Sequence, residues 1–126
     1  MTAVDYLSEV IATARSRDLD GSVTWRVADV TDPAAVDPGG RLSGTVTLVL
    51  DNGCVHGIAG RRRGGWARTV GALAAPGCVL LVRAVRRGHC GAGPRGIEPA
   101  ELASLLGDNW LPAPAPAPGW HRHVRS

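Results

Sequence analysis

The side chains best suited to chemistry in this sequence are its three cysteines and four histidines. Two of the cysteines lie beside histidines, in Cys54-Val55-His56 and in His89-Cys90. Together they offer four zinc ligands, but paired ligands in structural zinc sites are usually separated by two to four residues, and this spacing differs. We therefore interpret these groups as buried thiols and surface imidazoles, and we expect no metal site.

Nucleophilic catalysis would need a cysteine beside a histidine, with a third group that orients the base. Cys54, Cys78 and Cys90 are the possible nucleophiles, but the cationic part of the chain contains no acid to orient a histidine. The glycine-rich segment 91–96 lacks the Lys-Ser/Thr of a phosphate loop, and Pro94 removes a backbone donor. The sequence therefore predicts no catalytic residue, no cofactor and no enzymatic activity.

The arginines are concentrated in the second half of the chain. Residues 1–50 contain four arginines and seven acids, whereas residues 51–126 contain ten arginines and four acids. Between Arg61 and Arg95 there are eight arginines and no acid. Such a block favours an anionic partner. The alternative is genomic composition, because every basic residue is arginine and none is lysine, as in proteins from very GC-rich genomes.

Length and composition bound the class of protein. A chain of 126 residues with 44% hydrophobic residues is at most one ordinary globular domain. No apolar run is long enough to span a membrane, and acids lie in the first 20 residues, where a signal peptide would be basic and then apolar. An odd number of cysteines fits a reducing compartment with free thiols. We expect a cytoplasmic protein.

The stretch from Arg41 to Arg87 contains the strongest structural signals. Residues 44–50 alternate between two faces in the manner of a strand, and the next residues include Asn52-Gly53, a dipeptide that favours a tight hairpin turn. Residues 54–59 would return as the second strand. Residues 78–87 form another strand pattern, apolar on both faces in its first half, as in a central strand.

Helical signals flank these strands. Thr2 and Asp5 resemble a capping box, and apolar residues then recur at helical spacing to about Arg17. After the expected exposed loop 60–65, where three adjacent arginines cannot all be buried, Trp66 begins a short helical pattern. Another helix is expected from Glu98-Pro99 to Gly107.

Two segments complete the order of elements. Residues 22–30 read as a strand whose Trp25 is interpreted as a core residue in preference to a base-stacking platform. Residues 112–118 alternate Pro and Ala, which is typical of an extended spacer, and residues 119–126 form a short basic tail. His121 and His123 in this tail would make a poor metal site. We expect residues 1–111 to form the domain and residues 112–126 to lie outside its core.

The order of strand, two-stranded hairpin, short helix and strand over roughly residues 22–87 resembles the oligonucleotide/oligosaccharide-binding barrel, the OB-fold. The matching residues are Gly-Thr-Val-Thr-Leu-Val-Leu-Asp-Asn-Gly, with its Asp-x-x-Gly, and the later Pro-Gly-Cys-Val-Leu-Leu-Val. The resemblance implies a mainly β protein: a small OB-like β-barrel with an N-terminal helix, a C-terminal helix and a proline-rich tail.

The resemblance also implies a ligand surface on the second and third strands and their loops. Combined with the arginine block, it predicts weak, sequence-independent binding of single-stranded DNA or RNA through a basic surface, although the few aromatic residues argue against an extensive stacking platform. Trp66 has a rival interpretation as a core anchor. The alternative function is a non-enzymatic accessory subunit that docks a protein through the barrel or the tail. The expected nucleic-acid-binding residues are Thr45, Thr47, His56, Arg61, Arg62, Arg63, Trp66, Arg68, Arg83, Arg86 and Arg87.

Overall fold

A computed structural model of the chain describes residues 1–88 and 95–126. The segment that contains His89, Cys90 and most of the glycine-rich loop lies outside the described residues. None of the helices in the described ranges is both long and apolar enough to cross a membrane.

The chain begins with a strand–helix–strand unit. Strand β1 (Thr2–Asp5) leads to helix α1 (Ser8–Arg17), and β2 (Thr24–Val27) returns parallel to β1, with Thr2 opposite Thr24. The expected helix therefore exists, but the expected capping box is wrong. Thr2 and Asp5 belong to a strand because their backbone groups pair with β2, and helical geometry begins only after Asp5 accepts a hydrogen bond from the Leu7 N–H at 2.8 Å.

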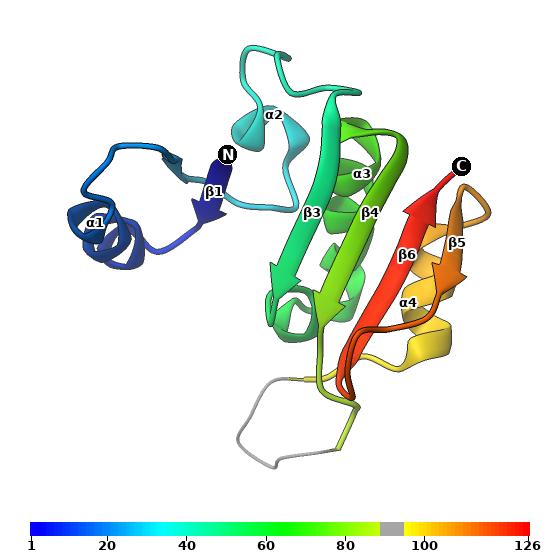
Figure 1. Ribbon diagram of the computed structural model, residues 1–126. Helices are drawn as coiled ribbons and strands as arrows, with labels where there is room; N and C mark the ends of the chain where they lie inside the picture. Colours follow the sequence, from blue (N-terminus) through cyan, green and yellow to red (C-terminus); the bar gives the residue numbers. More distant parts are fainter. Residues whose placement is uncertain (89–94) are drawn as a thin grey trace.

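The rest of the chain forms a four-stranded sheet in the order β3-β4-β6-β5, shown in Figure 1. Strands β3 and β4 are parallel, and β6 runs antiparallel to both β4 and β5. The elements in chain order are α2 (Pro33–Val36), β3 (Val46–Asn52), the short 3₁₀ turns η1 (Val55–Gly57) and η2 (Gly60–Arg62), α3 (Arg63–Leu73), β4 (Ala74–Arg83), α4 (Pro99–Leu106), β5 (Trp110–Ala113) and β6 (Trp120–Arg125).

The expected hairpin after β3 is wrong. The strand itself is present, but its partner is β4, which lies parallel to it, with Leu50 opposite Leu81. The reason lies at the end of β3, where the buried Asp51 carboxylate accepts the backbone N–H of Cys54 at 2.7 Å and that of Val55 at 3.1 Å. These bonds wind the chain into η1, so that Asn52-Gly53 begins a crossover toward α3.

The expected extended tail is also wrong. Strand β6 lies between β4 and β5, so its backbone is hydrogen-bonded on both sides. Trp110 at the start of β5 is buried, and the Arg125 guanidinium lies 5.7 Å from its ring centroid. The remaining proline-rich residues connect β5 to β6, and Pro114 and Pro116 line a pocket on the sheet face with Val79 and Leu81 of β4. The proline- and alanine-rich composition wrongly predicted an extended tail, because the stability of a strand at this position depends on partner strands that are distant in the sequence.

Helices α3 and α4 cover one face of this sheet and lie behind it in Figure 1. Trp66 and Val70 of α3 and Leu102 of α4 pack with Leu80 and Val82 of β4 in the hydrophobic core. This confirms the interpretation of Trp66 as a core anchor and rules it out as a base-stacking residue. On the opposite face, Leu48 and Leu50 of β3 remain 57% and 61% exposed.

The described strands form open sheets, so the predicted OB-like barrel is wrong and the fold is α/β. In one sheet β2 is added beside β1, and in the other sheet β4 is added beside β3. The side on which the next strand is added therefore reverses between the two sheets. A doubly wound α/β fold changes direction in this way, and its ligands bind at the carboxyl ends of the strands beside the change.

Candidate ligand site at the carboxyl ends of the strands

Three carboxylates lie at or just after the carboxyl ends of β1, β2 and β3. Asp5 is the last residue of β1, Asp29 follows β2 by two residues, and Asp51 is the penultimate residue of β3. Partial burial of the Cys54 thiol, together with the negative charges of Asp51, Asp5 and Asp29, raises the pKa of Cys54 to about 12, although the residue is exposed overall. The thiol is therefore protonated at neutral pH, and the three carboxylates add negative charge around it.

The three carboxylates have different hydrogen-bond partners. Asp29 accepts hydrogen bonds from the Thr31 hydroxyl at 2.7 Å and the Thr31 N–H at 2.9 Å, which lower its pKa, and it forms an ion pair with Arg62. Burial raises the pKa of Asp51. Asp5 uses Oδ1 for the Leu7 N–H, whereas its Oδ2 accepts no hydrogen bond from residues 1–88 or 95–126. Asp5 is therefore the carboxylate with an oxygen available to a ligand.

A pocket of about 380 Å³ adjoins this group at the ends of β3 and β4. The His56 ring is one of its walls, and His56 Nδ1 accepts the Val85 N–H at 3.0 Å. Because Nδ1 is an acceptor, the neutral imidazole carries its proton on Nε2 and presents a donor. This Nε2 lies beside Gly53, where a Cβ would be only 3.4 Å away. The pocket is lined by Asn52, Gly53, His56, Arg83, Ala84, Val85, Pro118 and Gly119.

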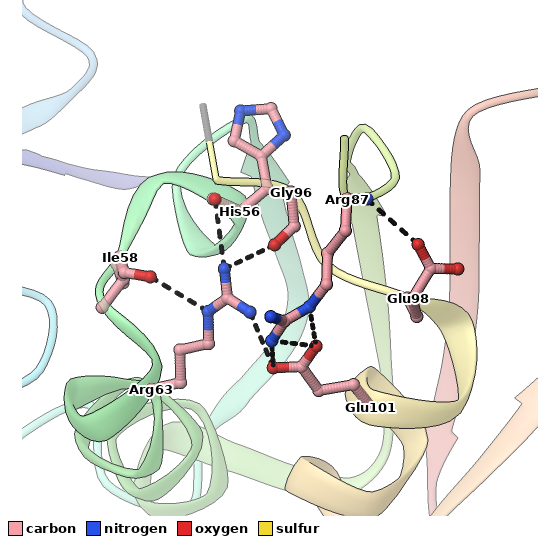
Figure 2. Close-up of polar contacts among 7 residues, drawn as sticks. All are labelled: His56, Ile58, Arg63, Arg87, Gly96, Glu98 and Glu101. Atoms are coloured by element: carbon pink, nitrogen blue, oxygen red, sulfur yellow. Dashed lines mark hydrogen bonds and ion pairs between the residues drawn. The ribbon is translucent and has the colours of Figure 1, made fainter. Parts of the chain in front are cut away.

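A buried arginine holds the backbone behind this pocket (Figure 2). Arg63 is only 2% exposed, and its guanidinium donates to the carbonyls of Ile58 at 3.0 Å, His56 at 3.2 Å and Gly96 at 2.6 Å. It also pairs with Glu101 of α4 at 2.7 Å. The residue that sequence analysis placed on a cationic surface is thus the centre of a structural network.

Arg87 extends this network at the protein surface. Its guanidinium binds Glu101 at 2.8 Å, and its backbone N–H donates to Glu98 at 3.0 Å. Hydrogen bonds from Arg87, and then from Arg63, lower the pKa of Glu101 despite an opposing contribution from burial. Figure 2 shows that the His56 ring points away from Arg63, whereas the His56 carbonyl points toward it. The network therefore holds the backbone at His56 in place, while the His56 ring lines the pocket.

The expected single cationic surface is not formed by the described residues. Arg62 pairs with Asp29, Arg63 is buried, and Arg87 pairs with Glu101, so acids from distant segments neutralise part of the arginine block. Of the expected residues, His56 and Arg83 share the pocket. Trp66 is buried in the core. Five more are exposed and dispersed over the loop before β3, β3 itself, η2, α3 and the segment after β4: Thr45, Thr47, Arg61, Arg68 and Arg86.

The sequence patterns do not identify the most informative residues of this site. They predict a helix cap at Asp5 and indicate no function for Asp29 or Asn52. The sequence did contain one signal for such a site, which is an acidic residue at the end of a short strand pattern. Asp5 is in this position, because it ends β1, which is parallel to β2. Within the described ranges, no group of three or more potential metal ligands is close enough to hold a metal ion.

No family model matches this sequence, and no curated protein matches it significantly. Similar folds do occur among solved structures. A structure reported for the conversion of a disulfide bond into a thioacetal group during echinomycin biosynthesis has a TM-score of 0.74, 18% identity and coverage of 99% of this chain and 66% of its own.

Two further structures contain S-adenosylhomocysteine. The N-methyltransferase NodS from Bradyrhizobium japonicum has a TM-score of 0.72 at 14% identity, with 98% of this chain and 65% of its own covered. The 1,6-didemethyltoxoflavin-N1-methyltransferase from Burkholderia thailandensis, which also contains its substrate, has a TM-score of 0.60 at 24% identity, with 98% of this chain and 58% of its own covered. The chain thus spans less than two thirds of these three proteins.

These likenesses overturn the functional expectations as well as the barrel. The expectations of single-stranded nucleic-acid binding and of a non-enzymatic role are wrong, because the structural neighbours include methyltransferases solved with S-adenosylhomocysteine. The alternative, an accessory subunit that docks a partner through a barrel or a free tail, loses both surfaces, because the sheets are open and the tail residues are part of one. At these identities the comparison establishes the fold alone, an α/β fold that this chain shares with solved methyltransferases.

Proposed function

We propose that this chain binds S-adenosylmethionine at the carboxyl ends of β1, β2 and β3 and takes part in methyl transfer to a small molecule. The observation that carries the proposal is the position of Asp5, with its available oxygen, at the end of the strand beside the change of direction. In doubly wound folds an acidic residue near this point binds ribose hydroxyls of nucleotide cofactors. Two structural neighbours contain the demethylated form of this cofactor.

The residues present fit the adenosine and sulfonium parts of the cofactor. Asp5 Oδ2 supplies an acceptor for ribose hydroxyls. Asp29 is already bound by Thr31 and Arg62, so its role is to hold the loop after β2 in place. Burial is the main cause of the raised pKa of Cys54, and the charges of Asp51, Asp5 and Asp29 add to it; these negative charges favour a cationic ligand at the same place. S-adenosylmethionine would supply a methyl group on a positively charged sulfur.

The pocket beside His56 suits the molecule that is methylated. Its volume of about 380 Å³ is within the range of small-molecule sites. His56 offers an N–H donor from Nε2, Asn52 offers an amide, and Arg83 supplies positive charge. These groups favour a small substrate that presents an oxygen acceptor or an anionic group.

The test is an NMR titration of the isotope-labelled chain with S-adenosylhomocysteine, which detects weak as well as tight binding. We expect amide shifts at the ends of β1, β2 and β3. Asp5→Asn should weaken binding about tenfold or more, because it removes the charge from the hydrogen bonds. Asp20→Asn, an exposed acid in the loop before β2, is the matched control and should have no effect. Absence of shifts at these strand ends, or equal binding by the two variants, would refute the proposal.

A further inference from the structure

The pocket at the ends of β3 and β4 presents polar side chains to a ligand more than it presents backbone. Two of the backbone N–H groups along its wall are used within the protein, since the Gly53 N–H donates to the Arg83 carbonyl at 3.0 Å and the Val85 N–H donates to His56 Nδ1 at 3.0 Å. A ligand in this pocket therefore meets the His56 ring, the Arg83 guanidinium and the Asn52 amide.

The His56 side chain is fixed as a hydrogen-bond donor. Its backbone carbonyl accepts the Gly96 N–H at 2.9 Å and the Arg63 guanidinium at 3.2 Å, and its Nδ1 accepts the Val85 N–H. A general base needs an unprotonated nitrogen that reaches the substrate. In His56 the unprotonated nitrogen faces Val85, and the nitrogen on the other side of the ring carries the proton. His56 can therefore position a ligand but cannot take a proton from it through Nε2.

Arg83 supplies the positive charge of the pocket. It is the last residue of β4 and lies opposite Asn52 of β3. Arg62, Arg63 and Arg87 each pair with an acid, whereas Arg83 forms no ion pair with any acid in the part of the chain that the structure describes. An arginine guanidinium matches a carboxylate through two parallel hydrogen bonds. The charge of Arg83 is thus available to an anionic ligand.

No acid opposes this charge from within the pocket. None of the residues that line it is Asp or Glu. The neighbouring acid in the chain is Asp51, and alternate residues of a strand point to opposite faces, so Asp51 and Asn52 lie on different faces of β3. The Asp51 carboxylate is buried and accepts the N–H groups of Cys54 and Val55. The pocket is therefore positively charged, while Asp5 supplies negative charge at the end of β1.

We propose that this pocket binds the carboxylate of a small organic acid, with the Arg83 guanidinium as its charge partner and the His56 Nε2–H and the Asn52 amide as its hydrogen-bond donors. As a description of the molecule that is methylated, this inference rests on the proposed function and narrows it to organic acids. As a description of what the pocket binds, it holds whichever cofactor occupies the neighbouring strand ends.

The arrangement favours a carboxylate over a phosphate group. Phosphate sites in proteins commonly use several backbone N–H groups at a helix N-terminus or in a glycine-rich loop. Here the N–H groups of Gly53 and Val85 already have partners, and one guanidinium carries the charge of the pocket wall. A carboxylate needs only the two parallel bonds that one arginine can supply.

NMR titration of the isotope-labelled 126-residue chain with matched acids and amides tests the proposal. The probes are benzoate with benzamide and phenylacetate with phenylacetamide, because the two members of each pair have nearly the same shape and differ in charge. The acids should shift the backbone signals of Gly53, Ala84 and Val85. Each amide should bind about tenfold more weakly or worse, since hydrogen bonds to charged groups are the stronger ones. Inorganic phosphate is the third arm and should bind more weakly than benzoate.

A pair of charge-removing variants locates the binding group. Arg83→Met should weaken benzoate binding about tenfold or more, because it removes the charged donor. Arg68→Met is the matched control, since Arg68 is an exposed arginine of α3 that forms no ion pair with the described acids, and it should leave benzoate binding unchanged. Both variants change the net charge equally, so a general electrostatic effect would weaken binding in both.

The ring nitrogens of His56 give a spectroscopic readout that is independent of affinity. Long-range proton–nitrogen correlation should show the proton on Nε2 and a bare Nδ1, with and without benzoate. A proton on Nδ1 of the neutral ring would remove His56 from the proposal as a donor and make it available as a base.

Four further results would overturn the proposal: no binding by either acid at the highest soluble concentration, equal binding by acids and amides, tighter binding of phosphate than of benzoate, or equal losses in Arg83→Met and Arg68→Met. None of these measurements uses S-adenosylhomocysteine. A chain that binds benzoate at Arg83 but not S-adenosylhomocysteine would refute the proposed function alone, and the reverse result would refute this inference alone.

Discussion

At the scale of single residues, the three consecutive arginines 61–63 have three different environments. Arg61 is exposed, Arg62 forms an exposed ion pair with Asp29, and Arg63 is buried among three carbonyls and Glu101. The energetic consequences follow from burial. Exposed ion pairs contribute about 0–1 kcal/mol. A buried charge that satisfies several buried acceptors cannot be removed without leaving those acceptors unpaired.

We predict that Arg63→Met lowers the free energy of unfolding by about 3–5 kcal/mol. The loss arises because the carbonyls of His56, Ile58 and Gly96 are left without this donor. Chemical denaturation of matched variants measures it. Arg62→Met should lower stability by about 1 kcal/mol or less, and Arg61→Met should change it by less than about 0.5 kcal/mol. Similar losses in all three variants would show that Arg63 is not the anchor.

At the scale of elements, α3 is positioned by a glycine at its first turn. A Cβ on Gly65 would be 2.4 Å from the Thr31 carbonyl oxygen and 2.8 Å from the Thr31 Cβ. No such contact exists at Gly71, near the other end of the same helix. Helix propensity and packing therefore act in opposite directions at Gly65, while only propensity acts at Gly71.

We predict that Gly71→Ala stabilises the protein by about 0.5–1 kcal/mol, because alanine favours the helix. Gly65→Ala should instead destabilise it by about 1–3 kcal/mol, since α3 must move away from the loop after β2. Thermal melts of the two variants provide the comparison. If Gly65→Ala is as stable as Gly71→Ala, the helix and the loop are not in close contact.

Strand β6 contributes a pH dependence through its buried histidine. Burial, and then the charge of His121, lowers the pKa of His123 below 6.5, and its Nδ1 has no hydrogen-bond partner among the described residues. Burial, and then Arg86, lowers the pKa of His121 as well. The unfolded chain takes up protons at these histidines near pH 6.5, whereas the folded chain resists them, so stability is lost as the pH falls below that value.

We predict that the free energy of unfolding decreases as the pH falls below 6.5, because the pKa of His123 and that of His121 are both lowered in the folded chain. His123→Leu should flatten this slope and should not reduce stability at neutral pH, because it removes an unpaired buried nitrogen. Denaturation at a series of pH values measures the slope. An unchanged slope in the variant would assign the dependence to other groups.

At the scale of the whole molecule, the last twenty residues are a structural part of the sheet. Strand β6 pairs with β4 on one side and β5 on the other, and Trp110 of β5 belongs to the core. Without these strands, one edge of β4 would lose its partner and α4 would lose its contacts with β5.

We predict that a chain ending at Gly107 lacks a cooperative unfolding transition. Its circular dichroism should show a gradual thermal change instead of a sigmoidal melt. Replacing Pro114 and Pro116 with alanine, in the connection between β5 and β6, is the control and should preserve the cooperative melt. A truncated chain that still melts cooperatively would mean that β3, β4 and the helices fold without β6.

The sequence alone determined those elements whose signal is local. The strand at 46–52, the helix that contains Trp66 and the helix after Glu98-Pro99 were all expected, since periodicity and end signals depend on neighbouring residues. The burial of Trp66 followed from its spacing with Val70. The sequence also shows the acid-free arginine block from Arg61 to Arg95. It does not show which distant acids form ion pairs with these arginines in the folded protein.

Only the tertiary structure decided how strands pair and which charges are neutralised. Asp51 turns the chain after β3 through two backbone hydrogen bonds, and this converts an apparent hairpin into a parallel crossover. The same crossover buries Arg63 against Glu101, 38 residues away, and brings Arg62 to Asp29 after β2. Strand pairing and ion pairing act between residues distant in the sequence, so no local pattern specifies them. The candidate site consists of such contacts, and for that reason it became visible only in the fold.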